Sequence, residues 1–305
     1  MGINLFKMGN LMKAFIFPGQ GSQSVGMAKD HFDSDSDVKK LFLKANDQLG
    51  YSLTDIMFEG PADKLMQTKH TQPAIFLHSI ALFRQMDDTP DAVAGHSLGE
   101  FSALVAARVI DFETALDLVD LRGNLMQEAG EMHPGGMAAI IGMDDDTVDS
   151  ICRKATDEIQ KPVVAANYNC PGQLVISGDV DAVKKAVDLA KEEGCRLAKI
   201  LPVSGAFHSP LMKPALEGLQ KQLEEITFRD PEFPLYSNAT AEPTQDAAEV
   251  KANLIAQLTS PVKWTQTLQN MEKNGITDFV EIGPGKVLQG LVKRTISNAN
   301  ISGRQ

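Results

Sequence analysis

The sequence lacks long apolar runs, paired cysteines and an excess of positive charge. No apolar run approaches the roughly 18 residues that a membrane-spanning helix needs, and the segment from Met1 to Lys13 is too short and too mixed for a secretory signal. Three cysteines without a CxxC pair argue against a disulfide framework or a zinc site and favour a reducing cytoplasm. A net charge of −11, from 29 Lys and Arg against 40 Asp and Glu, argues against nucleic acid as a partner.

The composition is that of a globular protein. Hydrophobic residues make up 43% and charged residues 23% of the 305 residues. This length is enough for one large domain, or for a core that carries a smaller second one. An anionic ligand would need a locally basic surface, because at physiological salt exposed charges act over roughly 8 Å.

Strands, glycine-rich turns and helices alternate along the first part of the chain. KAFIF at 13–17 predicts a short buried strand, and PGQGSQ after it predicts a glycine-rich turn. This alternation predicts an α/β fold with a mostly parallel sheet. A second strand is expected at 91–94, and helices are expected at 36–49, 73–86 (with Pro73 in its first turn), 98–109 and 113–129.

The middle of the chain has the order strand, helix, strand, strand, helix, strand, which is the ferredoxin-like pattern βαββαβ. We interpret residues 135–204 as a small inserted subdomain. The core then comprises residues 12–134 and 205–305, and residues 1–11 form an N-terminal extension. In the second part of the core we expect helices at 213–226 and 261–274, strands near 234–238 and at 277–282, and a last helix from Lys286.

Gly95-His96-Ser97-Leu98-Gly99 matches the pattern GxSxG. In that pattern the two glycines let a strand turn sharply into a helix, which lifts the serine oxygen clear of the sheet. The amide of Leu98 would lie at the helix start, where free N–H groups favour developing negative charge. The expected strand before and helix after the motif favour Ser97 as a nucleophile. The alternative is a helix-capping serine between turn glycines.

A serine hydroxyl needs a base to take its proton, and the sequence holds six histidines. His208 is the best candidate, because its segment SGAFHSP joins the inserted subdomain to the next core helix and active sites gather at such junctions. His96 adjoins Ser97, but neighbours along a tight turn seldom point at each other. The alternative for His208 is an exposed loop histidine. No carboxylate between residues 97 and 208 stands in a distinctive setting.

Arg122 lies on the apolar stripe of the helix expected at 113–129. Its neighbours three and four residues away are all Leu, Val or Met, so no local carboxylate can pair with it. A buried unpaired guanidinium is costly, and arginine binds carboxylates through two parallel hydrogen bonds. A substrate carboxylate is therefore one candidate partner. An internal salt bridge to a distant acid, or a tip that reaches water, are the alternatives.

Several segments together resemble the malonyl-coenzyme A:acyl carrier protein transacylases of fatty acid synthesis. The resemblance extends from residue 12 to residue 295, and its implied fold is an α/β-hydrolase-like core with a ferredoxin-like insert. The most specific segments are FPGQGSQ at 17–23, GHSLGE at 95–100, LRGNLMQ at 121–127 and GAFHS at 205–209. Further matches are NYNCPGQ at 167–173, QLTSPVKW at 257–264 and EIGPGKVL at 281–288.

The resemblance implies a role for each motif. Ser97 would be the nucleophile and His208 its base, with the backbone carbonyl of Gln257 orienting the histidine in place of a carboxylate. The backbone amides of Leu98 and Gln20 would form the oxyanion hole. Substrate-binding residues would be Arg122 on the malonyl carboxylate, Gln20, His96, Met126, Asn167, and Phe207 where related acyltransferases distinguish malonyl from branched groups.

The implied reaction moves a malonyl group from malonyl-coenzyme A (malonyl-CoA) to the phosphopantetheine thiol of acyl carrier protein through a malonyl-serine ester. We expect no bound cofactor or metal, no nucleic-acid or membrane partner, and a monomer in the cytoplasm. The alternatives are an esterase or thioesterase with the same serine motif, a non-catalytic protein that holds a carrier, and an acyltransferase of a polyketide or malonate-decarboxylating system.

Overall fold

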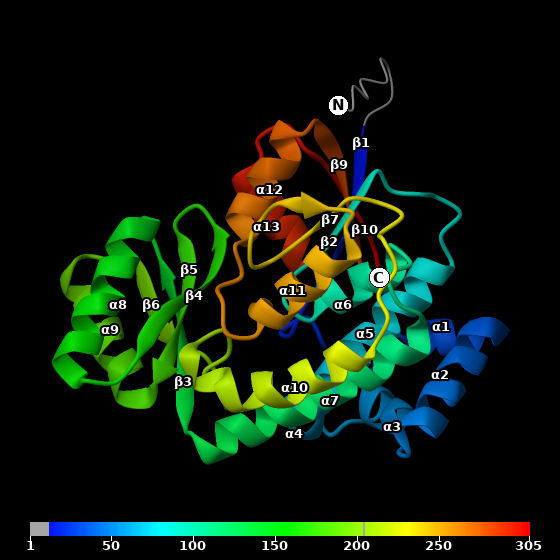
Figure 1. Cartoon of the computed structure of the whole chain (residues 1–305), viewed down its shortest axis with the longest axis horizontal. Coiled ribbons are helices and arrows are strands. Elements are labelled where there is room, and N and C mark those ends of the chain that lie inside the picture. The colour runs from blue at the N-terminus through cyan, green and yellow to red at the C-terminus, as the bar shows by residue number, and fades with distance from the viewer. Residues whose placement is uncertain (1–11, 204) are drawn as a thin grey trace.

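The computed structural model describes residues 12–203 and 205–305, so the predicted extension at 1–11 lies outside the described residues. Two separate sheets form within these ranges (Figure 1). The larger sheet contains β1 (Met12–Phe17), β2 (Ala92–Gly95), β7 (Leu235–Tyr236), β8 (Pro243–Thr244), β9 (Ile276–Ile282) and β10 (Asn300–Arg304). Its strand order is β10-β9-β1-β2-β7-β8, and every neighbouring pair is parallel except β7 with β8.

The helices around this sheet are α1 (Lys29–Ser34), α2 (Ser36–Leu49), α3 (Leu53–Phe58), α4 (Ala62–Leu65), α5 (Thr68–Arg84), α6 (Gly99–Ala106), α7 (Phe112–Met132), the 3-10 helix η1 (Pro210–Met212), α10 (Lys213–Glu225), α11 (Ala247–Gln257), α12 (Trp264–Lys273) and α13 (Val287–Thr295). Among the described residues, no helix is both long enough and apolar enough to cross a membrane.

The larger sheet is buried on both faces, as is usual for parallel strands. In β1, Phe15 and Phe17 belong to one hydrophobic cluster, and Ala14 and Ile16 belong to the cluster on the opposite face. The first cluster includes residues of α5, α6 and α7, and the second includes residues of α12 and α13. The sheet is therefore the middle layer between two groups of helices.

The second sheet contains β3 (Gly135–Ile141), β4 (Val163–Cys170), β5 (Gln173–Asp179) and β6 (Leu197–Ile200). It is antiparallel, with the order β4-β5-β3-β6. Helices α8 (Asp145–Ile159) and α9 (Val180–Glu192) complete the order βαββαβ, and Figure 1 shows this part set to one side of the larger sheet. The mostly parallel larger sheet and this separate antiparallel sheet confirm the predicted fold class. The proposed domain limits at 135 and 204 stay a prediction.

The structure contains elements that were not expected, namely α1, α3, α4, α11, β8 and β10, and one expected helix begins earlier than predicted. Helix α5 begins at Thr68, so that Pro73 lies inside the helix rather than in its first turn. The residues before the proline are held by tertiary contacts, since Thr71 is fully buried and donates a hydrogen bond to the Leu65 carbonyl, and such contacts override a proline's local preference. Helix α11 was not expected, because only three of its residues are buried and its apolar stripe is short.

Candidate active site

The serine turn lies between β2 and α6, at the carboxyl end of the parallel strands. Ser97 has a φ of +52°, in the left-handed region that few non-glycine residues adopt. A Cβ on Gly95 would lie 1.8 Å from the carbonyl carbon of Gly99, so the turn closes only with glycine at 95. A Cβ on Gly19 would lie 2.4 Å from the carbonyl oxygen of His96. The first glycine-rich turn therefore packs directly on the serine turn.

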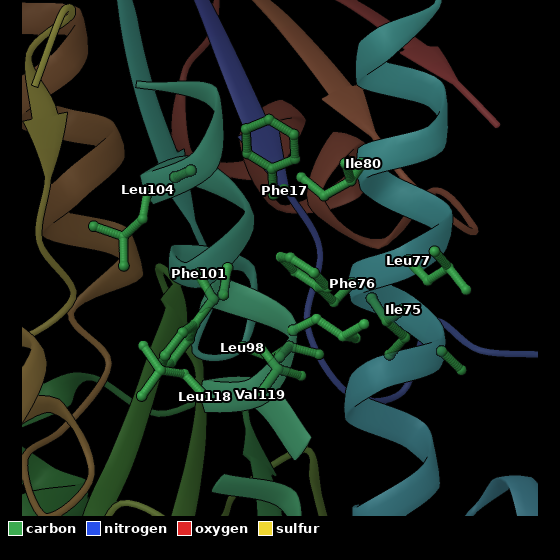
Figure 2. Close-up of a cluster of buried hydrophobic side chains, with 14 of the residues drawn as sticks. Phe17, Ile75, Phe76, Leu77, Ile80, Leu98, Phe101, Leu104, Leu118 and Val119 are labelled. Carbon is green, nitrogen blue, oxygen red and sulfur yellow. The ribbon is translucent and has the colours of Figure 1, made fainter. Parts of the chain in front are cut away.

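The packing of Leu98 and two hydrogen bonds with Asn238 hold this turn in place. Leu98 is buried in the hydrophobic core, among the side chains labelled in Figure 2. Asn238 accepts a hydrogen bond from the Ser97 amide at 2.6 Å, and its side chain donates another to the Gly95 carbonyl at 2.6 Å. Asn238 follows β7, which neighbours β2, so the loops after the two strands meet at one edge of the sheet. Asn238 was not predicted from the sequence, because no local pattern marks it.

His208 lies within hydrogen-bond distance of the serine. Its Nε2 is 2.7 Å from Ser97 Oγ, and its Nδ1 is 3.0 Å from the backbone oxygen of Gln257 at the end of α11. A neutral ring with its proton on Nδ1 satisfies both contacts, because Nδ1 then donates to the carbonyl and Nε2 accepts from the hydroxyl. Burial and the positive charge of Arg122 lower the pKa of His208 to about 3. The imidazole is therefore neutral at neutral pH, as a base must be.

Arg122 reaches the same hydroxyl from α7. Its Nη2 donates to Ser97 Oγ at 3.1 Å and to the side-chain oxygen of Gln257 at 3.0 Å, and its Nη1 donates to the side-chain oxygen of Gln72 at 2.7 Å. The side chain is 1% exposed, so its guanidinium does not reach water. Within residues 12–203 and 205–305, no carboxylate lies at salt-bridge distance from it. The guanidinium thus has neutral partners beside the candidate nucleophile.

His96 faces away from the serine hydroxyl. Its Nε2 lies 2.8 Å from Asn169 Oδ1, and its ring packs edge-on against Trp264 with 5.5 Å between ring centres. Burial lowers the pKa of His96. The structure therefore leaves His208, and not His96, in contact with Ser97, as the sequence analysis expected for neighbours along a tight turn.

A cavity of about 230 Å³ opens beside Ser97. The loops that follow β1 and β2 of the larger sheet contribute to its wall, and so do strand residues of the smaller sheet, including Val175 of β5. Gln257 is 1% exposed and supports the wall from behind through His208 and Arg122. The sequence-predicted residues that line the cavity are Gln20, His96, Ser97, Leu98, Arg122, Met126, Asn167, Phe207 and His208. Gln72, Asn169 and Arg294 also line the cavity, although no sequence pattern marks them as site residues.

The predicted oxyanion hole draws on two neighbouring strands. Gln20 follows β1 and Leu98 follows β2, and both line the cavity beside Ser97. The side chain of Gln20 donates to Thr68 Oγ1 at 3.5 Å, so its side-chain nitrogen is turned towards the start of α5. The use of the two backbone amides as oxyanion donors stays a prediction.

Buried neutral histidines predict a loss of stability in mild acid. Burial is the main cause that lowers the pKa values of His78 and His208 to about 3, below the 6.5 of an unfolded histidine. Between about pH 6.5 and pH 3 each of these histidines therefore binds more protons in the unfolded chain than in the folded one, and its contribution to stability falls as pH falls. We expect each of these histidines to lower the free energy of unfolding by about 1.4 kcal/mol per pH unit in this window.

Urea unfolding at pH 6 and pH 5 measures this loss. A His78→Leu variant is the matched control, because it removes the contribution of His78 and should show a shallower dependence of the free energy of unfolding on pH. The expectation fails if the free energy of unfolding is the same at the two pH values in both proteins.

Known proteins resemble this chain over nearly all of its described residues. The acyl transferase domain family matches residues 14–304. Malonyl CoA-acyl carrier protein transacylase of Bacillus subtilis (strain 168) is 46% identical over 284 residues, which cover 92% of this chain and 89% of that protein. The corresponding transacylase of Escherichia coli (strain K12) is 43% identical over 294 residues, which cover 95% of this chain and 94% of that protein.

A solved structure shows the same fold. The acyl carrier protein S-malonyltransferase of Vibrio cholerae superposes with a TM-score of 0.92 at 43% identity, covering 96% of each chain. These matches run through both sheets and every cavity motif named above. The chain therefore belongs to the acyl transferase domain family and, within it, to the malonyl CoA-acyl carrier protein transacylases.

Proposed function

We propose that this chain transfers a malonyl group from malonyl-CoA to the phosphopantetheine thiol of acyl carrier protein, and so supplies fatty acid synthesis. The names of its relatives support this donor and this acceptor. The observation that carries the proposal is Arg122, a buried guanidinium that contacts the Ser97 hydroxyl and has only neutral hydrogen-bond partners among the described residues. A malonyl carboxylate would give this guanidinium an anionic hydrogen-bond partner.

The proposed reaction has two steps through a malonyl ester on Ser97. In the first, Ser97 Oγ attacks the thioester carbonyl while His208 Nε2 takes the hydroxyl proton. The amides of Gln20 and Leu98 stabilise the tetrahedral oxyanion, by about 3–4 kcal/mol for each donor in comparable sites. His208 then returns the proton to the coenzyme sulfur, which leaves as a thiol. In the second step the carrier thiol attacks the ester, and the same groups act in reverse.

Arg122 couples malonyl binding to the strength of the base. Its positive charge is one cause of the low pKa of His208. A carboxylate bound to Arg122 offsets that charge, so the imidazole becomes a better base when the correct acyl group is in place. An acetyl group has no carboxylate to bind the guanidinium, and this difference favours malonyl over simple acyl donors.

Intact-protein mass spectrometry tests the proposal. After mixing with malonyl-CoA, we expect a malonyl adduct on Ser97 that persists until a carrier with a phosphopantetheine thiol is added. The matched control is the same carrier without its phosphopantetheine arm, which should leave the adduct in place. Release of free malonate at the same rate with and without the thiol would instead identify an esterase or thioesterase.

We also propose that the chain acts as a monomer in the cytoplasm. All of the groups that the mechanism uses come from one chain, which supports activity without a second copy. The three cysteines are free thiols, which supports a reducing compartment. Sedimentation of the purified protein measures its oligomeric state.

A further inference from the structure

Glu100 is a buried carboxyl group that the mechanism above does not use. It lies on α6, three residues after Ser97, and is 0% exposed. Its Oε2 accepts hydrogen bonds from the Asn238 amide at 3.1 Å and from the side-chain nitrogen of Gln257 at 2.9 Å. Its Oε1 is buried without a hydrogen-bond partner among the described residues. A buried carboxylate with one unsatisfied oxygen is costly, so this group needs a further explanation.

One glutamine side chain joins Glu100 to Arg122. Gln257 donates to Glu100 through its nitrogen and accepts from Arg122 through its oxygen, at 2.9 Å and 3.0 Å. The same nitrogen also donates to the Ser97 carbonyl at 2.9 Å. The two buried groups of opposite charge are thus bridged by a neutral amide, which leaves the guanidinium free to take another anion.

The remaining charged and titratable groups of this cluster lie on the cavity side. They are His208, before η1, and His96, after β2, and both have pKa values lowered by burial. The residues that β1 buries at 14–17 carry no charge, and α5 contributes the neutral Gln72. Glu100 is therefore the negative charge of the cluster, and Arg122 is the positive one.

We propose that Glu100 balances the charge of Arg122 in the free protein and takes up a proton when a substrate carboxylate occupies Arg122. The inference rests on the proposed function, because it takes malonyl as the ligand of Arg122. Glu100 is then a positioning residue: it acts on the substrate through Gln257 and Arg122. Proton uptake prevents two negative charges from being buried around one guanidinium.

The chemistry of the two groups supports this exchange. Burial raises the pKa of Glu100 to about 7, against the opposing effects of its two hydrogen bonds and of Arg122. Burial lowers the pKa of Arg122 to about 10, against the charge of Glu100. A second carboxylate at Arg122 cancels the effect of the guanidinium and favours the neutral form of Glu100 further. Oε1 accepts no hydrogen bond among the described residues, so a proton can be added there without displacing the two hydrogen bonds that Oε2 accepts.

Isothermal titration calorimetry in buffers of different ionisation enthalpy counts the protons taken up on binding. A Ser97→Ala protein prevents acyl transfer, and malonyl-CoA is compared with acetyl-CoA. The coenzyme phosphates titrate near pH 6 but are common to both ligands. For a one-unit rise in the pKa of Glu100, malonyl-CoA should take up about 0.4 protons per site more than acetyl-CoA at pH 7. Its affinity relative to acetyl-CoA should rise as pH falls from 8 to 6.

A Glu100→Gln substitution in the same protein should abolish the difference in proton uptake and its pH dependence. The glutamine keeps an acceptor for Asn238 and Gln257 and resembles the protonated acid, so malonyl-CoA should bind at pH 8 as tightly as the parent binds at pH 6. Glu281→Gln is the matched control, because Glu281 is also 0% exposed but accepts from the Leu288 and Gln289 amides at α13. Glu281→Gln should retain the difference in proton uptake between malonyl-CoA and acetyl-CoA.

The outcomes separate the inference from the function on which it rests. Tight malonyl-CoA binding with the same proton uptake as acetyl-CoA overturns the role of Glu100 and leaves the transferase proposal intact. No preference for malonyl-CoA over acetyl-CoA overturns both. If Glu100→Gln fails to fold, the comparison of the two ligands in the protein that retains Glu100 still decides the question.

Discussion

Replacing Ser97 with alanine is expected to lower malonyl transfer by about 10⁴- to 10⁶-fold, the range seen when the nucleophile of a serine enzyme is removed. The hydroxyl is the only group of the cavity that contacts both His208 and Arg122 in the described structure. Without it, no ester can form and the malonyl group has no position between donor and acceptor. The rate of carrier malonylation, measured with purified carrier protein, gives the size of the loss.

Ser102→Ala is the matched control for this substitution. Ser102 lies on α6, the helix that follows the serine turn, is 1% exposed, and has a hydroxyl without a hydrogen-bond partner among the described residues. Ser102→Ala should retain near-normal transfer. A loss found only with Ser97→Ala is then due to the missing nucleophile and not to a disturbed helix. His208→Ala should approach the loss of Ser97→Ala, and the double variant should fall little further, because the two groups act as one unit. Carrier malonylation by Ser97→Ala at the parent rate would contradict the proposed mechanism.

Arg122→Ala should separate malonyl from acetyl transfer. Loss of a bidentate, charge-assisted hydrogen bond in a buried site costs about 3–4 kcal/mol. This corresponds to a decrease of about 200- to 1000-fold in kcat/KM for malonyl-CoA. Acetyl transfer should fall far less, since acetyl has no carboxylate to lose. The measurement is kcat/KM for both donors with one carrier protein.

Two further variants sharpen this test. Arg122→Lys keeps the charge but loses the paired donors, so its malonyl transfer should lie between those of the parent and of Arg122→Ala. Arg108→Ala removes an exposed arginine that pairs with Glu232 on the surface. It should change kcat/KM for neither malonyl-CoA nor acetyl-CoA. Equal losses of malonyl and acetyl transfer in Arg122→Ala would contradict the assignment of Arg122 to the malonyl carboxylate.

Much of the site followed from local patterns in the sequence. The glycines at 95 and 99 predicted the serine turn, and the structure places Ser97 in a left-handed conformation there. The apolar neighbours of Arg122 predicted a buried guanidinium without a local acid, and the structure buries it among neutral hydrogen-bond partners. The choice of His208 depended on its place at a junction, and the carbonyl of Gln257 was identified only through the resemblance. Its side chain, which joins Arg122 to Glu100, was not predicted at all.

The sequence by itself determined the features that arise from neighbours in the chain: the alternation of strands and helices, the βαββαβ order, and the serine turn that only glycine at 95 allows. Sterics and side-chain periodicity act over a few residues, so they can be read without a fold. The tertiary structure alone decided which distant groups meet at Ser97. Asn238 binds the Ser97 amide across 141 positions of the chain. Such partners are fixed by which strands lie side by side, and no local pattern encodes that order.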